Sequence, residues 1–286
     1  MKGIILAGGS GTRLSPLTLA TSKQLLPVYN KPLIYYSLSI LMLMNINDIL
    51  IITTPRDADA FKNLLGTGRQ FGINLYYELQ ENPEGIPQAF ILAESFIGND
   101  NVTLILGDNI FYGANLVEIL SSATDEITGA TIFCYPVDDP SRFGVLEVDE
   151  TGGILSFEEK PEKPKSNLAV TGLYIYDSSV VSLAKKLSKS DRGEYEITDL
   201  NNLYLRENRL RFYSLTRGFA WLDAGTFESL FEASSFVKSV ESRQGFLVSA
   251  PEEIAFRNGW ISKNELRMAA KSYNNSYGRK LMKLIE

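Results

Sequence analysis

A glycine-rich segment near the start of the chain is the first feature that could do chemistry. It follows a short apolar run, residues 4–7, and consists of Gly8, Gly9, Ser10, Gly11, Thr12 and Arg13. Glycines at the end of a buried strand let backbone N–H groups approach a triphosphate closely, and an arginine adds positive charge for the phosphates. The segment would also suit a tight structural turn with an exposed arginine, so both interpretations stay open.

The spacing in this loop excludes two better-known phosphate-binding patterns. It lacks the Gly-Lys-Ser/Thr ending of a P-loop. Leu14 stands where the dinucleotide fingerprint has its third glycine, and no suitable acidic residue follows the second apolar run.

Two aspartates could hold a metal ion. Asp108 follows the apolar run at residues 102–106, so we expect its carboxylate at the carboxyl edge of a sheet, beside the glycine loop. Asp223 precedes a helix-start pattern at Thr226. Two carboxylates from distant positions suit Mg²⁺, which takes few protein ligands and completes its octahedron with phosphate oxygens and water. On this pattern alone, either aspartate would more often be a turn or cap residue.

The chain contains no histidine, which removes the usual general base, the Ser-His-Asp arrangement and most zinc sites. A reaction whose nucleophile is already ionised at neutral pH, such as a phosphate oxygen, needs no proton acceptor. The composition therefore favours phosphoryl or nucleotidyl transfer.

The charge balance narrows the choice of partners. A formal net charge of -6 argues against contact with a nucleic-acid backbone, so an anionic ligand needs a local basic pocket.

The first residues lack the apolar core of a secretory signal, and the apolar stretch 33–44 is too short to span a bilayer, so we expect a cytoplasmic protein without a membrane partner. The single cysteine, Cys134, predicts a buried structural thiol and excludes a disulfide within the chain.

The elements that must position these residues alternate along the first half of the chain. Strands are expected at residues 4–7, 49–53, 74–77 and 102–106, and helices at residues 32–44, 56–65 and 88–96. Short apolar strands separated by helices predict an α/β fold with a Rossmann-like, mostly parallel central sheet flanked by helices. In such sheets, ligands bind beyond the carboxyl ends of the strands.

The second half is expected to begin with an antiparallel β insertion at residues 131–176, where Gly152 and Gly153 mark a turn between two apolar runs. Helices around 179–187 and 198–206, a strand around 211–215 and a mostly helical C-terminal region should follow. We divide the chain into a catalytic core, residues 1–240, and a C-terminal helical region, residues 241–286, within one compact unit.

Several motifs together resemble those of the sugar-nucleotide pyrophosphorylases. The most specific are residues 6–14 (LAGGSGTRL) and 22–28 (SKQLLPV). Six more follow in order along nearly the whole chain: 106–109 (LGDN), 142–145 (RFGV), 158–161 (EEKP), 169–174 (AVTGLY), 193–199 (GEYEITD) and 221–226 (WLDAGT). The resemblance implies a nucleotide-diphospho-sugar transferase fold and a Mg²⁺-dependent transfer that joins glucose 1-phosphate to dTTP and releases pyrophosphate.

The resemblance also assigns roles to single residues. It implies Arg13, Lys23 and Lys160 as the catalytic cations, and Asp108 and Asp223 as the metal ligands. The nucleotide-binding residues that it implies are Gly8, Gly9, Ser10, Gly11, Thr12, Arg13, Gln24, Gln80, Gly85 and Asp108. The sugar-phosphate-binding residues that it implies are Asn109, Gly144, Glu159, Lys160 and Val170.

Gln80 and the backbone at Gly85 are assigned by the resemblance to the edge of thymine. A glutamine amide both donates and accepts, which matches an imide N–H between two carbonyls. Uracil presents the same edge, so a UTP-dependent or amino-sugar pyrophosphorylase stays an alternative. A catalytically silent sugar-nucleotide sensor is a third reading. A glycosyltransferase is a fourth, although residues 107–109 do not form an Asp-x-Asp metal motif.

Three positions depart from the commoner family pattern: Pro87 near the base, Phe143 near the sugar, and Ala114 where relatives often have histidine in a regulatory nucleotide site. Control by a dTDP-sugar end product is therefore a weaker expectation than catalysis. The helical tail resembles the region through which family members form tetramers from dimers, so we expect a homo-oligomer. The tail would equally suit helices that only cover the core.

Overall fold

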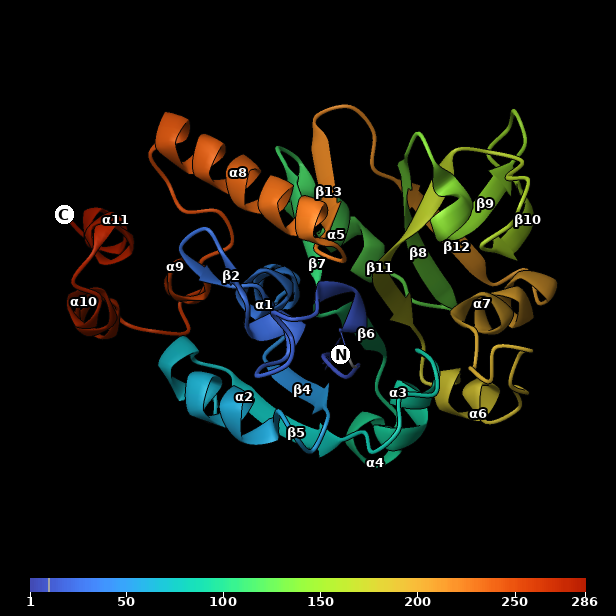
Figure 1. Ribbon diagram of the computed structural model, residues 1–286, viewed down its shortest axis with the longest axis horizontal. Helices are drawn as coiled ribbons and strands as arrows, with labels where there is room; N and C mark the ends of the chain where they lie inside the picture. Colours follow the sequence, from blue (N-terminus) through green and yellow to red (C-terminus); the bar gives the residue numbers. More distant parts are fainter. Residues whose placement is uncertain (10) are drawn as a thin grey trace.

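The structure is a computed structural model that describes residues 1–9 and 11–286, so the expected phosphate-binding residue Ser10 lies outside the described residues. Within them, a nine-stranded sheet runs through the centre of the molecule (Figure 1). Its strands are β1 (Lys2–Leu6), β4 (Asp48–Thr53), β5 (Asn74–Leu79), β6 (Val102–Leu106), β8 (Ala130–Pro136), β9 (Gly144–Val148), β10 (Ile154–Glu159), β11 (Leu168–Tyr176) and β12 (Leu210–Ser214).

The predicted division of the sheet is confirmed. Strands β6, β1, β4 and β5 are neighbours in this order and run parallel, whereas β11 pairs antiparallel with β6, β8 and β9, and β10 pairs antiparallel with β9. The β-rich insertion therefore widens the parallel half, as expected, and β12 adds a parallel strand beyond β8.

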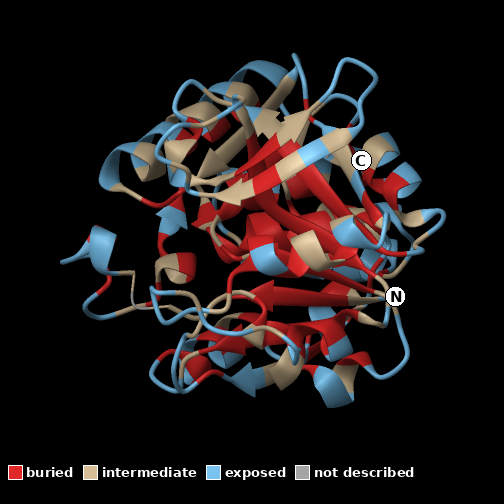
Figure 2. Cartoon of the chain, turned by 90° about the vertical axis from the view of Figure 1, so that its right-hand side faces the viewer, coloured by how far each residue is buried: buried red, intermediate tan, exposed pale blue. Residues whose placement is uncertain are grey.

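Helices cover both faces of the sheet. Alternation along β1 sends Ile5 to one apolar cluster and Ile4 and Leu6 to the other, because successive side chains of a strand point to opposite faces. The first face is covered by α1 (Ile34–Leu43), α2 (Ala58–Leu65) and α5 (Leu116–Thr124), and the second by α3 (Gln88–Leu92), α4 (Glu94–Ile97), α6 (Val180–Ala184) and α7 (Ile197–Arg206). Figure 2 shows the strands as the buried centre of the molecule.

Some expected element bounds were wrong. One helix was expected at residues 88–96, but Ala93 leaves helical torsions (φ −86°, ψ 7°) and separates α3 from α4. The helix expected from residue 32 begins at Ile34, because Lys31 and Pro32 form strand β3 (Lys31–Pro32), which pairs with β2 (Pro27–Val28). The helix expected from residue 56 begins at Ala58, after a turn that the Asp57 N–H closes on the Thr54 carbonyl.

A small second sheet was not expected and is important for the site. Strand β7 (Asn109–Gly113) pairs antiparallel with β13 (Phe219–Asp223), and Asp223 lies opposite Asn109 in the register. Helix α8 (Phe227–Gln244) begins directly after β13 with Thr226 as its cap. Thr226 accepts the Ser229 N–H and Ser229 Oγ accepts the Thr226 N–H, a reciprocal pair that stabilises a helix start.

The C-terminal region continues with α9 (Pro251–Arg257), α10 (Lys263–Ser272) and α11 (Ser276–Lys283), which lie at one end of the molecule (Figure 1). Ile254, Leu266 and Leu281 belong to the same apolar cluster as Ile5, so the tail shares the core of the parallel half. The boundary at residue 240 stays a prediction. No helix in the described part of the chain is long and apolar enough to cross a membrane.

Candidate active site

Two adjoining cavities lie beyond the carboxyl ends of β1 and β6. The first has a volume of about 370 Å³ and the second about 300 Å³. Both are lined by Arg13, Ile86, Leu106 and Asp108, which therefore mark the place where the cavities meet. Two ligands that react with each other at this junction can therefore occupy one cavity each.

The glycine loop lines the first cavity through Gly8, Gly9, Gly11 and Thr12. Gly11 has a left-handed backbone (φ 59°), a conformation that glycine adopts without a steric penalty. Thr18 Oγ1 donates to the Gly11 carbonyl at 2.9 Å, which fixes this turn. Arg13 follows within a short 3-10 helix, Thr12–Leu14, whose Leu14 is buried and anchors it.

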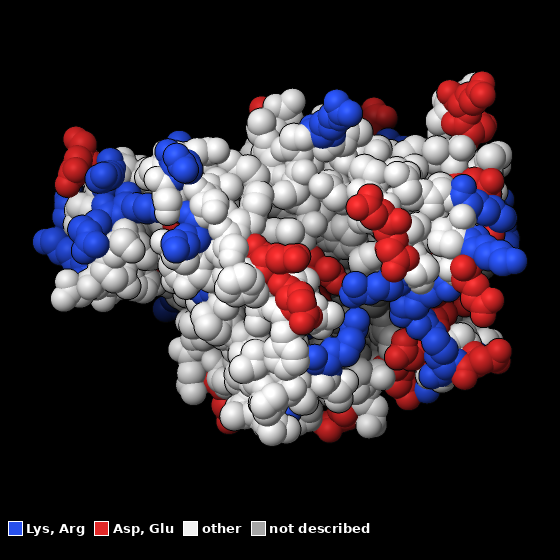
Figure 3. Space-filling view, turned by 45° about the horizontal axis from the view of Figure 1, so that its top comes forward, with Lys and Arg blue, Asp and Glu red and all other residues white. Residues whose placement is uncertain are grey.

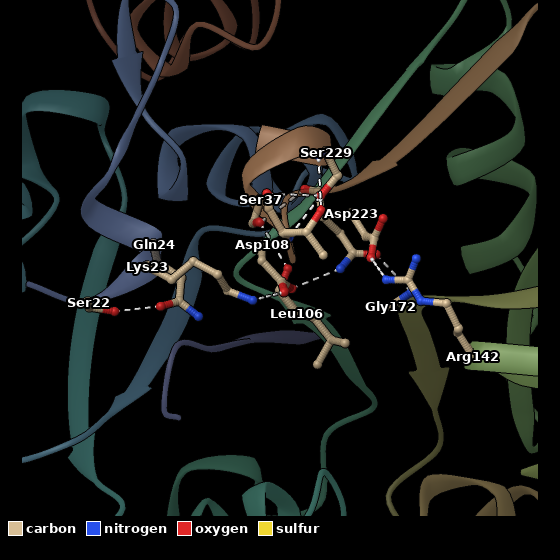
Figure 4. A network of polar contacts seen from close by, with 12 residues as sticks. Ser22, Lys23, Gln24, Ser37, Leu106, Asp108, Arg142, Gly172, Asp223 and Ser229 are labelled. Atoms are coloured by element: carbon tan, nitrogen blue, oxygen red, sulfur yellow. Dashed lines mark hydrogen bonds and ion pairs between the residues drawn. The ribbon is translucent and has the colours of Figure 1, made fainter. Parts of the chain in front are cut away.

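Lys23 and Asp108 form an ion pair at the junction of the cavities (Figure 4). Asn109 Nδ2 donates to Asp108 Oδ1 at 3.0 Å. Burial raises the pKa of the Asp108 carboxyl, but the charge and hydrogen bond of Lys23, with the Asn109 amide, outweigh burial and hold that pKa below its usual value. Asp108 is therefore a carboxylate at neutral pH.

Asp223 enters the site from the second sheet, because the pairing of β13 with β7 puts it beside Asp108. The Ala224 N–H donates to the Asp108 carbonyl at 3.1 Å, which holds the two segments together. Arg142 Nη2 faces Asp223 Oδ2 at 3.7 Å, as Figure 4 shows. Burial raises the pKa of Asp223 and the charge on Asp108 raises it further, although Arg142 and Lys23 oppose the shift.

The donor set at the junction fits one hard divalent cation that shares its shell with a ligand. Two carboxylates converge there, and Mg²⁺ takes one or two protein carboxylates together with phosphate oxygens and water. Among residues 1–9 and 11–286, no group of three or more carboxylate, thiol or imidazole side chains is arranged to hold a metal ion alone.

The second cavity collects the residues expected to bind a sugar phosphate. Its lining includes Asn109, Gly144, Glu159, Lys160 and Val170, together with Asp223. Glu159 Oε2 accepts from Thr198 Oγ1 at 2.5 Å, and Glu159 Oε1 lies 3.6 Å from Lys160 Nζ. A carboxylate and an ammonium group therefore stand together at this wall.

Asn109 lines the second cavity, but its amide is already engaged. Its Oδ1 accepts the Gly172 N–H at 3.0 Å and Trp221 Nε1–H at 2.6 Å, while its Nδ2 donates to Asp108. These bonds let Asn109 orient the Asp108 carboxylate. The sequence predicted a contact of Asn109 with the sugar phosphate and not this role.

The end of the first cavity away from the junction suits a nucleobase. Leu6 and Pro83 give the first cavity apolar walls, and Gln80 and Gly85, the two residues expected at the base, line it. Gln24, expected to bind the nucleotide, lines the same cavity. A Cβ atom on Gly8 would lie 2.2 Å from Gln80 Oε1, so glycine at position 8 lets the Gln80 amide reach the loop.

The model of the Nucleotidyl transferase family matches residues 2–240 of the chain, which is more than half of its length. The chain belongs to this family. A glucose-1-phosphate thymidylyltransferase of Neisseria gonorrhoeae is 57% identical over 286 residues, covering 100% of this chain and 99% of that one. The enzyme of the same name from Mycolicibacterium smegmatis is 55% identical over 287 residues, with the same coverage.

Solved structures support the fold of this nucleotidyl transferase. A Bacillus anthracis protein assigned as a glucose-1-phosphate thymidylyltransferase, solved with sucrose, has a TM-score of 0.75 and 45% identity, covering 82% of this chain and 94% of that chain. A UDP-glucose pyrophosphorylase solved with UDP-glucose has a TM-score of 0.71 and 26% identity, covering 83% of this chain and 98% of that chain. The expected family, fold class and nucleotidyl transfer chemistry are confirmed.

Sequence reasoning missed several residues of this nucleotidyl transferase site. Arg142 and Trp221 line the second cavity, and Trp221 packs against Phe143 with ring centroids 5.1 Å apart. Arg192 Nη2 donates to Glu159 Oε1 at 3.4 Å. Arg142 and Trp221 stood inside recognised motifs, whereas no sequence signal separates Arg192 from the other cations of the chain.

Proposed function

We propose that this nucleotidyl transferase joins dTTP and α-D-glucose 1-phosphate to give dTDP-glucose and pyrophosphate. The observation that carries the proposal is that the two cavities meet at Arg13 and Asp108. The first cavity has apolar and amide groups that suit a base, and the second has the carboxylate of Glu159 beside the ammonium group of Lys160. Relatives that are more than half identical to this chain over their whole length are named glucose-1-phosphate thymidylyltransferases, after this reaction.

The chemistry is an in-line displacement. A phosphate oxygen of the sugar phosphate forms a bond to the α-phosphorus of dTTP, and the bond from that phosphorus to the bridging oxygen of pyrophosphate breaks. The nucleophile is already ionised at neutral pH, so a chain without histidine can perform the step. Arg13 and Lys23 stand at the junction and offset the charge that develops on the phosphates.

Mg²⁺ is the divalent ion we assign to the site, held by Asp108 and Asp223, where it would draw charge from the phosphate oxygens. Asn109 keeps the Asp108 carboxylate oriented, and Lys23 keeps it ionised. Lys160 binds the phosphate of the sugar, and Glu159, with the backbone at Gly144 and Val170, receives the hydroxyl groups.

Assembly and control extend the proposal. The helical tail and α8 would join copies of the chain into a dimer or tetramer, and a dTDP-sugar end product would act at a separate regulatory site. Figure 3 shows basic side chains gathered at the end formed by α10 and α11, apart from the charged residues around the central hollow. Helices α10 and α11 carry the basic residues Lys263, Arg267, Lys271, Arg279 and Lys283.

Pyrophosphate release on mixing the protein with dTTP, glucose 1-phosphate and Mg²⁺ tests the proposal. We expect turnover that requires all three components and that is faster with dTTP and glucose 1-phosphate than with UTP or glucosamine 1-phosphate. Faster turnover with UTP, or with glucosamine 1-phosphate, would show that the proposed substrates are wrong. Binding of dTDP-glucose without any pyrophosphate release would identify a sensor instead of an enzyme.

A further inference from the structure

Gln88, the first residue of α3, lies behind the wall of the base end and bonds to Gln80, which lines it. Gln80 Nε2 donates to Gln88 Oε1 at 2.6 Å. The backbone N–H of Glu84 donates to the same oxygen at 2.9 Å. One amide oxygen of Gln88 thus receives two donors, one of them from the main chain.

The direction of these bonds is set by groups that cannot reverse. A backbone N–H can only donate, so the oxygen of the Gln88 amide must face Glu84 N–H. The Gln88 Nε2 lies 3.4 Å from Glu84 Oε2, and a carboxylate can only accept. Lys189 Nζ donates to Glu84 Oε1 at 2.6 Å and steadies that carboxylate.

The orientation of Gln80 follows from that of Gln88. Because Gln88 presents an oxygen, Gln80 must turn its nitrogen toward Gln88, and its Oε1 then lies on the side of Gly8. Gln80 is only 2% exposed, so its amide has little room to adopt another rotamer. Among residues 1–9 and 11–286, the side chain of Gln80 bonds only to Gln88, so its oxygen and its second N–H can meet a base in the first cavity.

We propose that Gln88 is a positioning residue that sets the base specificity of the first cavity. With its oxygen held as an acceptor, Gln80 can receive the ring N3–H that thymine and uracil carry. Cytosine has a lone pair at N3, which would face the lone pairs of Gln80 Oε1, and a buried acceptor left without a donor is costly. The inference rests on the proposed placement of the nucleotide, and it names the residue that makes this placement selective.

The test compares the dissociation constants of dTTP and dCTP, measured by titration calorimetry on the full chain without sugar phosphate. The wild-type protein should prefer dTTP by about 10- to 100-fold, the cost of one buried unpaired acceptor. Gln88→Met keeps the length of the side chain but removes the acceptor, so Gln80 can turn over and the preference should fall to within about threefold. Gln88→Glu combined with Glu84→Gln keeps an acceptor oxygen toward Gln80 without placing two carboxylates side by side, and it should retain the preference.

Gln70→Met is the matched control, because Gln70 Nε2 donates to the Leu65 carbonyl at 2.7 Å, outside both cavities, and its loss should leave the ratio unchanged. Gln88→Lys offers donors only, so the ratio should fall in this variant too, and it decides the matter if Gln88→Met does not fold. Equal weakening of both nucleotides in Gln88→Met, or a wild-type protein that does not distinguish them, would overturn the inference. If the ratios of dissociation constants change as expected but the protein releases no pyrophosphate, the proposed reaction is refuted and the role of Gln88 is not.

Discussion

Asp108 and Asp223 lie close together, but their carboxyl groups have different partners. Asp108 is held by Lys23 and Asn109, and its pKa is depressed. Within the described part of the chain, the Asp223 carboxyl group pairs only with Arg142, at the longer distance of 3.7 Å, and burial together with the charge on Asp108 raises its pKa. Asp108 is therefore a fixed anion, whereas Asp223 gains most from an added cation that would neutralise both groups.

Replacing either aspartate with asparagine should slow pyrophosphate release by roughly 10²–10³-fold, because each change removes one charged ligand from the reacting phosphates. Thermal melting should show that both variants stay folded. Asp48→Asn is the control, since Asp48 begins β4, at the end of the strand away from the site, and its Oδ1 accepts from Asn74 Nδ2 there at 2.9 Å. Near-normal turnover of Asp223→Asn would contradict the metal assignment.

At the scale of elements, the base end depends on a segment that is neither helix nor strand. Residues 83–86 are held by the loop that precedes α7, where the Tyr195 N–H donates to the Glu84 carbonyl at 2.7 Å. Gly85 has a φ of 105°, and a Cβ atom there would lie 2.1 Å from the Tyr195 carbonyl oxygen. The close approach of the two segments therefore requires glycine at position 85.

Gly85→Ala should raise the KM for dTTP by about tenfold or more, since backbone strain at such a position costs on the order of 1–3 kcal/mol and the segment must move to avoid the clash. Gly152→Ala is a matched control, because Gly152 also has a positive φ (86°) but a Cβ atom there would meet nothing within 4 Å. The two variants should be compared in steady-state kinetics. A similar KM in both would show that contact with Tyr195 does not shape the base end.

At the scale of the whole molecule, a buried cluster of charged side chains connects strand β3, near the start of the chain, with helices α8 and α11. Glu241 is fully buried and bonds to Lys31 Nζ at 3.2 Å and Lys280 Nζ at 3.0 Å. Burial raises the pKa of Glu241, but Lys31, Lys280 and the Val248 N–H outweigh burial and hold that pKa below its usual value. Burial likewise lowers the pKa of Lys31, to about 8, against the pull of Glu241.

Lys31→Met should lower the free energy of unfolding at pH 7 by about 3 kcal/mol, because it leaves a buried carboxylate with fewer partners. A carboxyl group with a depressed folded pKa contributes stability above its unfolded pKa and loses it as the pH falls through the folded value. Glu241 of the variant has fewer partners to hold its pKa down, so it should take up a proton at a higher pH than Glu241 of the wild type. The difference in unfolding free energy between Lys31→Met and the wild type should therefore shrink as the pH falls and both groups become protonated.

Denaturant unfolding at several pH values checks this prediction. Lys185→Met is the control, since Lys185 pairs with Glu94 on the surface, where an ion pair contributes little. A difference that stays constant from pH 7 to pH 3 would show that Lys31 stabilises the fold through packing and not through its charge.

The sequence by itself determined the architecture of the parallel half. Apolar runs of strand length, separated by helices, predicted β4 and β6 to within one residue, and the Gly152-Gly153 turn predicted the β9–β10 hairpin. These features depend on local composition and periodicity, which the chain carries within each segment. The break at Ala93 was missed because a helix end without a glycine, a proline or a capping side chain leaves little local signal.

The types of residue in the site were also set by the sequence: a glycine loop, cations, two aspartates and an amide for the base. Only the tertiary structure decided which of them meet. The pairing of β13 with β7 brings Asp223 to Asp108, and Glu84 orients Gln88 and through it Gln80. Such pairings depend on long-range register and on the direction of single hydrogen bonds, which no local pattern specifies because each is chosen by packing across the whole fold.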